Sequence, residues 1–208
     1  MMITAATLIY WTMLAGVALA AITGVLDAGR KGMDVVGACA AGLATAAGGG
    51  TVRDLLLGRP VFWITDQSYL FVALIAALAA FFLVRAVRLP VRLFLIPDAI
   101  GLALFTVSGT QIALDAGVPW LVAGLMGVIT GVVGGVLRDI LCNDIPLIFL
   151  PGELYAMAAA GGATAVVGLH SAGVHHEIAA IVGFVVAAGL RLAAMAFRLR
   201  SAEWEPLE

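Results

Sequence analysis

Two stretches of the sequence decide the fold: Gly48-Gly49-Gly50-Thr51-Val52-Arg53-Asp54 and, 85 positions later, Gly134-Gly135-Val136-Leu137-Arg138-Asp139. Each stretch lies late in a long apolar segment. Charged side chains inside an apolar helix are costly in lipid, so they usually face a protein interior or a water-filled cavity. The repetition indicates that the glycines and the charges belong to an internal repeat.

The composition is that of a membrane protein. Of the 208 residues, 63% are hydrophobic and 12% are charged, whereas soluble domains are about half apolar and about a quarter charged. The net charge of −2 and the lack of a broad basic surface argue against nucleic acid as a partner. The sequence has no phosphate loop, nucleophile elbow or zinc-binding helix motif, so we expect neither an enzyme nor a resident metal or cofactor.

The apolar segments predict an all-α polytopic membrane protein with seven transmembrane helices. A helix needs about 20 apolar residues to cross the hydrocarbon core of a bilayer. The first segment is predicted to be a retained span, because it lacks the basic start of a signal peptide. The predicted spans are 3–26, 34–57, 67–87, 96–115, 119–142, 153–170 and 175–197. They form a single domain over residues 1–200, followed by an acidic tail at 201–208.

The repeat extends beyond the glycine motif and relates three spans to three others. Thr23-Gly24 matches Ser108-Gly109 at the same offset of 85. Repeat one then covers about 3–87 and repeat two about 96–170, while the span at 175–197 has no counterpart. Because three is an odd number, the second copy enters the membrane from the opposite side. This predicts an inverted repeat with a pseudo-two-fold axis in the membrane plane.

Basic residues set the predicted orientation. They are concentrated on the side opposite to the N-terminus, and positive residues mark the cytoplasmic side. The N-terminus is therefore expected outside and the C-terminus in the cytoplasm. Arg85, Arg88 and Arg92 belong to the basic side, where they either contact anionic lipid headgroups or serve only to anchor the topology.

The glycines of the motif have two interpretations. Successive glycines weaken a helix by about 1 kcal/mol each relative to alanine. Gly48, Gly49, Gly50, Gly134 and Gly135 are therefore expected to break spans two and five and to shape an ion path. Irregular backbone at membrane depth is tolerated where it is buried or lines water. The alternative is close packing, because small residues let membrane helices approach each other.

The charges of the motif also have two predicted roles. Neighbouring residues on a helix point about 100° apart, so we expect crossed pairs of Arg53 with Asp139 and of Arg138 with Asp54. Such pairs would brace the kinks or set gating, and lining of the path is an equal alternative. Asp54, Asp139 and Asp98 are the carboxylates expected to attract cations.

This arrangement resembles the prokaryotic trimeric intracellular cation (TRIC) channels, and it is similar to a bacterial domain family labelled as glycine transporters. The resemblance covers about residues 5–197 and is carried by the two motifs. The first copy is complete, whereas the second has Val133 where its first glycine would stand. This difference raises the question of whether the two halves open alike.

The resemblance implies a symmetric homotrimer with one pore inside each protomer, among spans one, two, four and five. It also implies a path for monovalent cations, chiefly potassium with sodium less favoured, in the inner membrane of a bacterium. We therefore predict a potassium-permeable channel. One alternative is a secondary transporter for a small amino acid such as glycine, which inverted repeats with broken helices suit equally well. The other is a membrane scaffold that transports nothing.

Overall fold

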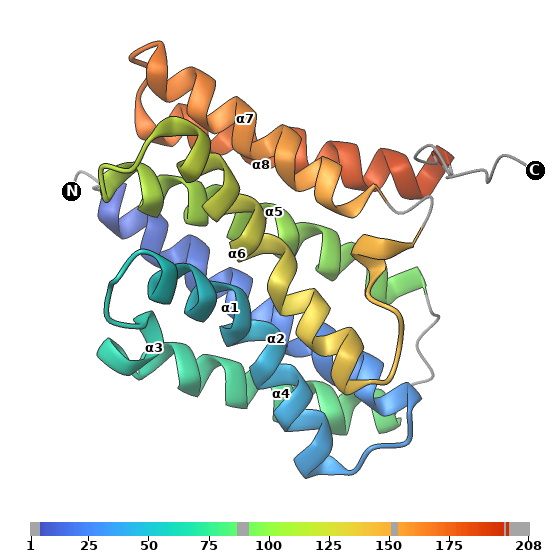
Figure 1. Cartoon of the computed structure of the whole chain (residues 1–208). Coiled ribbons are helices and arrows are strands. Elements are labelled where there is room, and N and C mark those ends of the chain that lie inside the picture. The colour runs from blue at the N-terminus through green and yellow to red at the C-terminus, as the bar shows by residue number, and fades with distance from the viewer. Residues whose placement is uncertain (1–4, 87–91, 151–153, 198, 200–208) are drawn as a thin grey trace, which may run out of the picture.

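The computed structural model describes residues 5–86, 92–150, 154–197 and 199, which form a bundle of long helices (Figure 1). In chain order the elements are α1 (Ala5–Arg30), α2 (Val35–Leu56), α3 (Phe62–Thr65), α4 (Ser68–Ala86), α5 (Arg92–Asp115), α6 (Trp120–Leu141), the 3₁₀ helix η1 (Leu147–Phe149), α7 (Tyr155–Ser171) and α8 (His176–Phe197). The predicted all-helical class is confirmed for this part of the chain. The short elements α3 and η1 were not predicted.

Five of the described helices are long and apolar enough to cross a membrane. They contain the segments Ile9–Arg30, Val35–Leu56, Leu95–Asp115, Trp120–Leu141 and His176–Phe197. A shorter apolar segment, Ser68–Leu83, lies in α4. Since a span needs about 20 apolar residues, these lengths agree with a polytopic membrane protein.

The helix ends follow from local sequence. Asp34 begins α2 because its carboxylate accepts a hydrogen bond of 2.8 Å from the backbone N–H of Gly37, which satisfies one of the free donors of the first turn. Most of the connections after the long helices contain a residue with positive φ, a conformation that glycine and asparagine adopt most readily. These residues are Gly32, Gly58, Gly117, Asn143 and Gly173.

Helices α2 and α6 cross at the centre of the bundle (Figure 1) and touch through their backbones. A Cβ added at Gly49 would overlap the carbonyl oxygen of Thr130, and one added at Gly134 would overlap that of Thr45. Residue numbers rise along α2 as they fall along α6 at this contact, so the helices run antiparallel. Both pairs of equivalent residues are 85 positions apart, so each half of the chain makes the same contact as the other.

The other helices surround this crossing in two similar groups. Helix α1 packs against α2 and α4, and α5 packs likewise against α6 and α7. The groups meet through α1 and α5 as well as through α2 and α6. Helix α8 lies against α5 and α7, so Figure 1 shows α4 on one side of the bundle and α7 with α8 on the other.

The predicted helix breaks are wrong. Helix α2 continues through Gly48–Gly50 and α6 through Gly134–Gly135. The packing interpretation explains this, because a glycine that lets two backbones touch gains contacts that offset its weak helix propensity. Helix α1 also continues past residue 26, so Asp27 is helical and does not belong to a connection.

Candidate functional site

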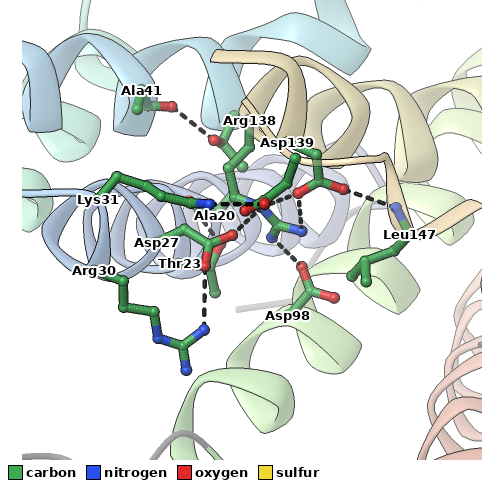
Figure 2. Close-up of polar contacts among 12 residues, drawn as sticks. Ala20, Thr23, Asp27, Arg30, Lys31, Ala41, Asp98, Arg138, Asp139 and Leu147 are labelled. Atoms are coloured by element: carbon green, nitrogen blue, oxygen red, sulfur yellow. Dashed lines mark hydrogen bonds and ion pairs between the residues drawn. The ribbon is translucent and has the colours of Figure 1, made fainter. Parts of the chain in front are cut away.

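Arg138 lies at the centre of a buried charge cluster near the end of α6. Its Nε lies 2.9 Å from Oδ1 of Asp139 and 3.1 Å from Oδ2 of Asp27, and its Nη1 donates a hydrogen bond of 2.6 Å to Oδ1 of Asp98. These carboxylates come from α6, α1 and α5, and Figure 2 shows them converging on the guanidinium. Arg138 is 0% exposed, so the carboxylates, in place of water, stabilise its charge.

Arg53 makes the same local contact near the end of α2. Its Nε donates a hydrogen bond of 2.9 Å to Oδ1 of Asp54. The other oxygen of Asp54 accepts from the backbone N–H of Phe62 at 2.9 Å, just as Asp139 accepts from Leu147 in the second half. In both halves a backbone donor after the helix therefore fixes the carboxylate that holds the arginine.

The surroundings of the two arginines differ. Within the described residues, Arg53 forms an ion pair with one carboxylate, whereas Arg138 forms ion pairs with three. The ring of Phe62 lies 5.8 Å from the Arg53 guanidinium carbon, a distance at which an aromatic face attracts a cation. Each arginine and its own ion-pair partners therefore sum to a neutral group at Arg53 and to a negative group at Arg138.

The crossed pairs predicted between Arg53 and Asp139 and between Arg138 and Asp54 are wrong. Each arginine pairs with the aspartate that follows it in sequence. The prediction compared only the directions in which neighbouring residues leave a helix. An arginine side chain is long enough to fold back across that angle, and the backbone N–H after the helix orients the aspartate toward it.

A pocket of about 260 Å³, counting space open to its surroundings, lies beside the Arg138 cluster. It is lined by residues of α1, α2, α5, α6 and α7. The polar groups in its lining come from Asp98, Thr23, Thr45 and Tyr155. The structure thus places a carboxylate and several hydroxyl groups around one hollow next to the α2–α6 crossing.

The predicted path residues divide between this pocket and the helix contacts. Asp98, Gly134 and Gly135 line the pocket. Gly134 also belongs to the helix contact with Thr45, and the glycines of the first motif face neighbouring side chains or backbone without lining this pocket: Gly48 faces Leu137, Gly49 faces Thr130 and Gly50 faces Phe62. The carboxylates Asp54 and Asp139 are buried in the ion pairs described above.

The same fold and repeat occur in known proteins. A protein-family profile described as "Glycine transporter" matches residues 10–85 and 95–171, one match in each half of the chain. The chain belongs to this family. The UPF0126 inner membrane protein YadS of Escherichia coli strain K12 is 42% identical to it over 196 residues, which cover 93% of this chain and 94% of YadS.

Solved TRIC channels share the fold of this glycine transporter family member. The TRIC trimeric intracellular cation channel orthologue from Rhodobacter sphaeroides is 39% identical, with a TM-score of 0.88 over 93% of this chain and all of that one. A second TRIC cation channel is 34% identical, with a TM-score of 0.86 over 95% of this chain and 97% of that one. The predicted resemblance to TRIC channels is confirmed.

Sequence reasoning missed three residues at or beside the site in this glycine transporter family member. Asp27 was assigned to a connection, although it lies four residues after Thr23 and hence on the same face of a helix. Tyr155 donates a hydrogen bond of 3.5 Å to Oδ1 of Asp98. The guanidinium carbon of Arg191 lies 4.9 Å from the Tyr155 ring, and Arg191 is buried, although positive charges were expected to remain at the cytoplasmic surface.

The proposed lipid contact at Arg85, Arg88 and Arg92 lies outside what the structure describes. Arg88 falls outside the described residues, and only the backbone of Arg85 and Arg92 is described. Their role therefore stays a prediction from the sequence.

A surface ion pair links the two halves near the Arg138 cluster. Nζ of Lys31 donates a hydrogen bond of 2.7 Å to Oδ1 of Asp144, and this contact raises the pKa of the Lys31 amine. The pair is therefore present at neutral pH, and on the alkaline side it is lost as the pH rises through that raised pKa.

We expect Lys31→Glu to lower the thermal midpoint only slightly, because exposed ion pairs stabilise little. The doubly swapped variant, with Lys31→Glu and Asp144→Lys, should return to the midpoint of the wild type. A melting series in detergent checks this. A double variant less stable than Lys31→Glu alone would contradict the pairing.

Proposed function

We propose that this chain is a monovalent cation channel, permeable to potassium, with a path inside each protomer between its two halves. The observation that carries the proposal is the likeness in fold to TRIC cation channels over more than nine tenths of the chain. The pocket beside the α2–α6 crossing supports it, because a carboxylate and hydroxyl groups there suit a cation. Arg53 comes after the contact residue Gly49 in α2, and Arg138 comes after Gly134 in α6. Because these helices run antiparallel, the two arginine–aspartate pairs lie at opposite ends of the crossing.

We further propose that seven helices span the membrane, namely α1, α2 and α4 to α8. The reciprocal contact of Gly49 with Thr130 and of Gly134 with Thr45 supports an inverted repeat, because an antiparallel crossing of equivalent residues is what a two-fold axis in the membrane plane requires. The basic residues support an N-terminus outside and a C-terminus in the cytoplasm. The name of YadS supports the bacterial inner membrane.

A homotrimer is proposed on the strength of the Rhodobacter sphaeroides relative, which is described as trimeric. Each protomer would then carry its own path, since the pocket is lined by residues of a single chain. Crosslinking in native membranes checks the assembly. A series of crosslinked bands whose largest species is a dimer would contradict the trimer.

The buried arginines support a closed path in this structure. Arg53 and Arg138 are 1% and 0% exposed. The Arg138 ion pairs join α6 to α1 and α5, and the Arg53 ion pair lies within α2 at the other end of the crossing. We propose that opening separates these helices and that Arg53 and Arg138 set gating in this way.

A transporter for a small amino acid such as glycine is the second candidate. The description of the matching family profile favours it. A glycine zwitterion needs an anionic partner for its amine and a cationic partner for its carboxylate. Asp98 lines the pocket, and Arg138 lies behind it, 2.6 Å from Asp98.

Recordings from purified protein in planar bilayers separate the two candidates. We expect discrete unitary currents in symmetric potassium chloride, with a reversal potential that shifts toward the potassium equilibrium value in a gradient. Empty liposome fusions provide the control. Saturable uptake of labelled glycine without unitary currents would overturn the channel and establish the transporter.

A further inference from the structure

The three histidines of the chain all lie in or beside one turn, which joins α7 to α8. They are His170, His175 and His176, and Figure 1 shows this turn at the opposite end of the bundle from the end of α6, where Arg138 lies. We propose that His170 and His176 together bind one divalent transition-metal ion, such as Cu²⁺ or Zn²⁺. This inference goes beyond the proposed function and does not depend on it.

The rings of His170 and His176 are separated by the distance that a shared metal ion requires. Their centres lie 5.2 Å apart, and their planes meet at 79°. A zinc–nitrogen bond of about 2.0–2.1 Å puts the centre of each ring about 3.2 Å from the ion, so two rings bound at a tetrahedral angle lie about 5.2 Å apart. Rotation about the last torsion of a histidine side chain is soft. A nitrogen of each ring can therefore turn toward an ion between them. Both residues are half-buried, so solvent still reaches them.

The backbones that carry the two rings are held in place by three helices. His170 lies in the last turn of α7, and His176 is the first residue of α8. The chain reverses between them through Gly173, whose φ of 74° suits glycine. The buried side chain of Gln111 in α5 donates a hydrogen bond of 2.9 Å to the backbone carbonyl of His176. An ion bound to both rings would therefore join α7 to α8 beside a fixed contact with α5.

The surrounding charges and the ligand type both suit a transition-metal cation. His170 lies at the C-terminal end of α7, where the helix dipole is negative. Glu177 adds a carboxylate in the first turn of α8, next to His176. Imidazole nitrogen is a preferred ligand of Cu²⁺, Ni²⁺ and Zn²⁺, whereas Mg²⁺ and Ca²⁺ prefer oxygen. The histidine pair therefore selects transition metals.

The histidine pair makes an open metal site, in which water completes the coordination. Among the described residues, no group of three or more His, Cys, Asp or Glu side chains is arranged to hold a metal ion. Two protein ligands leave at least two positions of a tetrahedral ion to water. Such an ion exchanges with the solution, so its occupancy would follow the metal concentration. In the proposed topology this turn lies outside, where the ion would act as an external ligand.

Electron paramagnetic resonance of Cu²⁺ tests the ligands directly. One equivalent of Cu²⁺ added to the untagged full chain in detergent should give a spectrum with two nitrogen ligands. His170→Phe and His176→Phe each keep an aromatic ring but remove one ligand. Each should therefore lose the two-nitrogen spectrum and raise the dissociation constant about tenfold or more. His175→Phe is the matched control, because it removes an exposed histidine of the same turn, and it should leave the spectrum unchanged.

Thermal melting gives a second readout with a different ion. Zn²⁺ at ten times its dissociation constant should raise the midpoint of the wild type and of His175→Phe by about 3 °C. The same concentration of Mg²⁺ should leave both midpoints unchanged. His170→Phe and His176→Phe should lose the rise with Zn²⁺. Their midpoints in EDTA should match that of the wild type, which shows that the fold persists without the imidazole.

The outcomes separate a site at these two rings from binding elsewhere. A wild-type protein without the two-nitrogen spectrum would overturn the site. A spectrum that His175→Phe removes would overturn it as well. So would a spectrum that persists in both His170→Phe and His176→Phe, because copper would then be bound elsewhere, such as at the thiol of Cys39. Loss in both of these variants, with an unchanged spectrum in His175→Phe, would support it. Unitary potassium currents test the channel separately, so either proposal can fail while the other stands.

Discussion

Replacing Arg138 with methionine is expected to lower the free energy of unfolding by about 3–5 kcal/mol, because it leaves buried carboxylates without their counter-charge. Three of them now converge on the guanidinium: Asp27, Asp98 and Asp139. Methionine keeps the length and the apolar stem of the side chain, so the loss measures charge and not packing. Denaturation of the purified protein in detergent, followed by tryptophan fluorescence, gives the difference.

Arg53→Met is the matched control for this loss. It leaves one carboxylate, Asp54, which retains the hydrogen bond from Phe62 N. We therefore expect a smaller loss than at Arg138. Adding Asp98→Asn to Arg138→Met should recover part of the stability, because it removes one of the uncompensated charges. The effects of the two substitutions on the free energy of unfolding should therefore not be additive. Equal losses at Arg53 and Arg138, with additive effects of Asp98→Asn, would contradict the asymmetry between the two clusters.

The second large effect is expected at the α2–α6 crossing. Gly49→Ala or Gly134→Ala places a Cβ where the carbonyl oxygen of Thr130 or Thr45 now lies. Backbone atoms cannot rotate away, so the helices must separate. Overpacking of this kind destabilises by about 1–3 kcal/mol. Each variant should also change unitary conductance, because the pocket adjoins the crossing.

Gly168→Ala is the internal control for the crossing. Gly168 lies in α7, and an added Cβ would have no neighbour within 4 Å. Alanine there should stabilise the protein by about 0.5–1 kcal/mol through its better helix propensity. A Gly49→Ala variant that behaves like Gly168→Ala would mean that the two backbones are not held in contact.

Sequence patterns predicted the helices well because apolar length and turn residues are local signals. The offset between Arg53 and Arg138 also located the repeat, and the family profile matches the chain at two places with the same spacing. For the motif glycines, the sequence predicted a helix break and offered close packing of two helices only as the alternative. Glycine weakens an isolated helix, but here each helix is supported by a contact with the other. The contact residues, Thr130 for Gly49 and Thr45 for Gly134, are distant in sequence, so no local pattern predicts the contact.

The charge cluster was harder to predict because its members come from three helices. Asp98 and Arg138 are 40 positions apart, and Asp27 lies in the opposite half of the chain. No periodicity relates such residues. The pairing of each arginine with its neighbour depended on a backbone N–H after the helix, at Phe62 or Leu147, which sequence reasoning did not consider.

The unlike surroundings of Arg53 and Arg138 have a consequence for the symmetry of the molecule. Two identical polypeptides related by a two-fold axis would carry every carboxylate twice, so Asp98 at one end would require a second copy at the other. Here the counterparts of Asp98 and Asp27 are Met13 and Ile112. Because both halves belong to one chain, they can carry different residues at equivalent positions, so the two ends of the α2–α6 crossing carry different numbers of buried carboxylates, which a dimer of identical halves could not do.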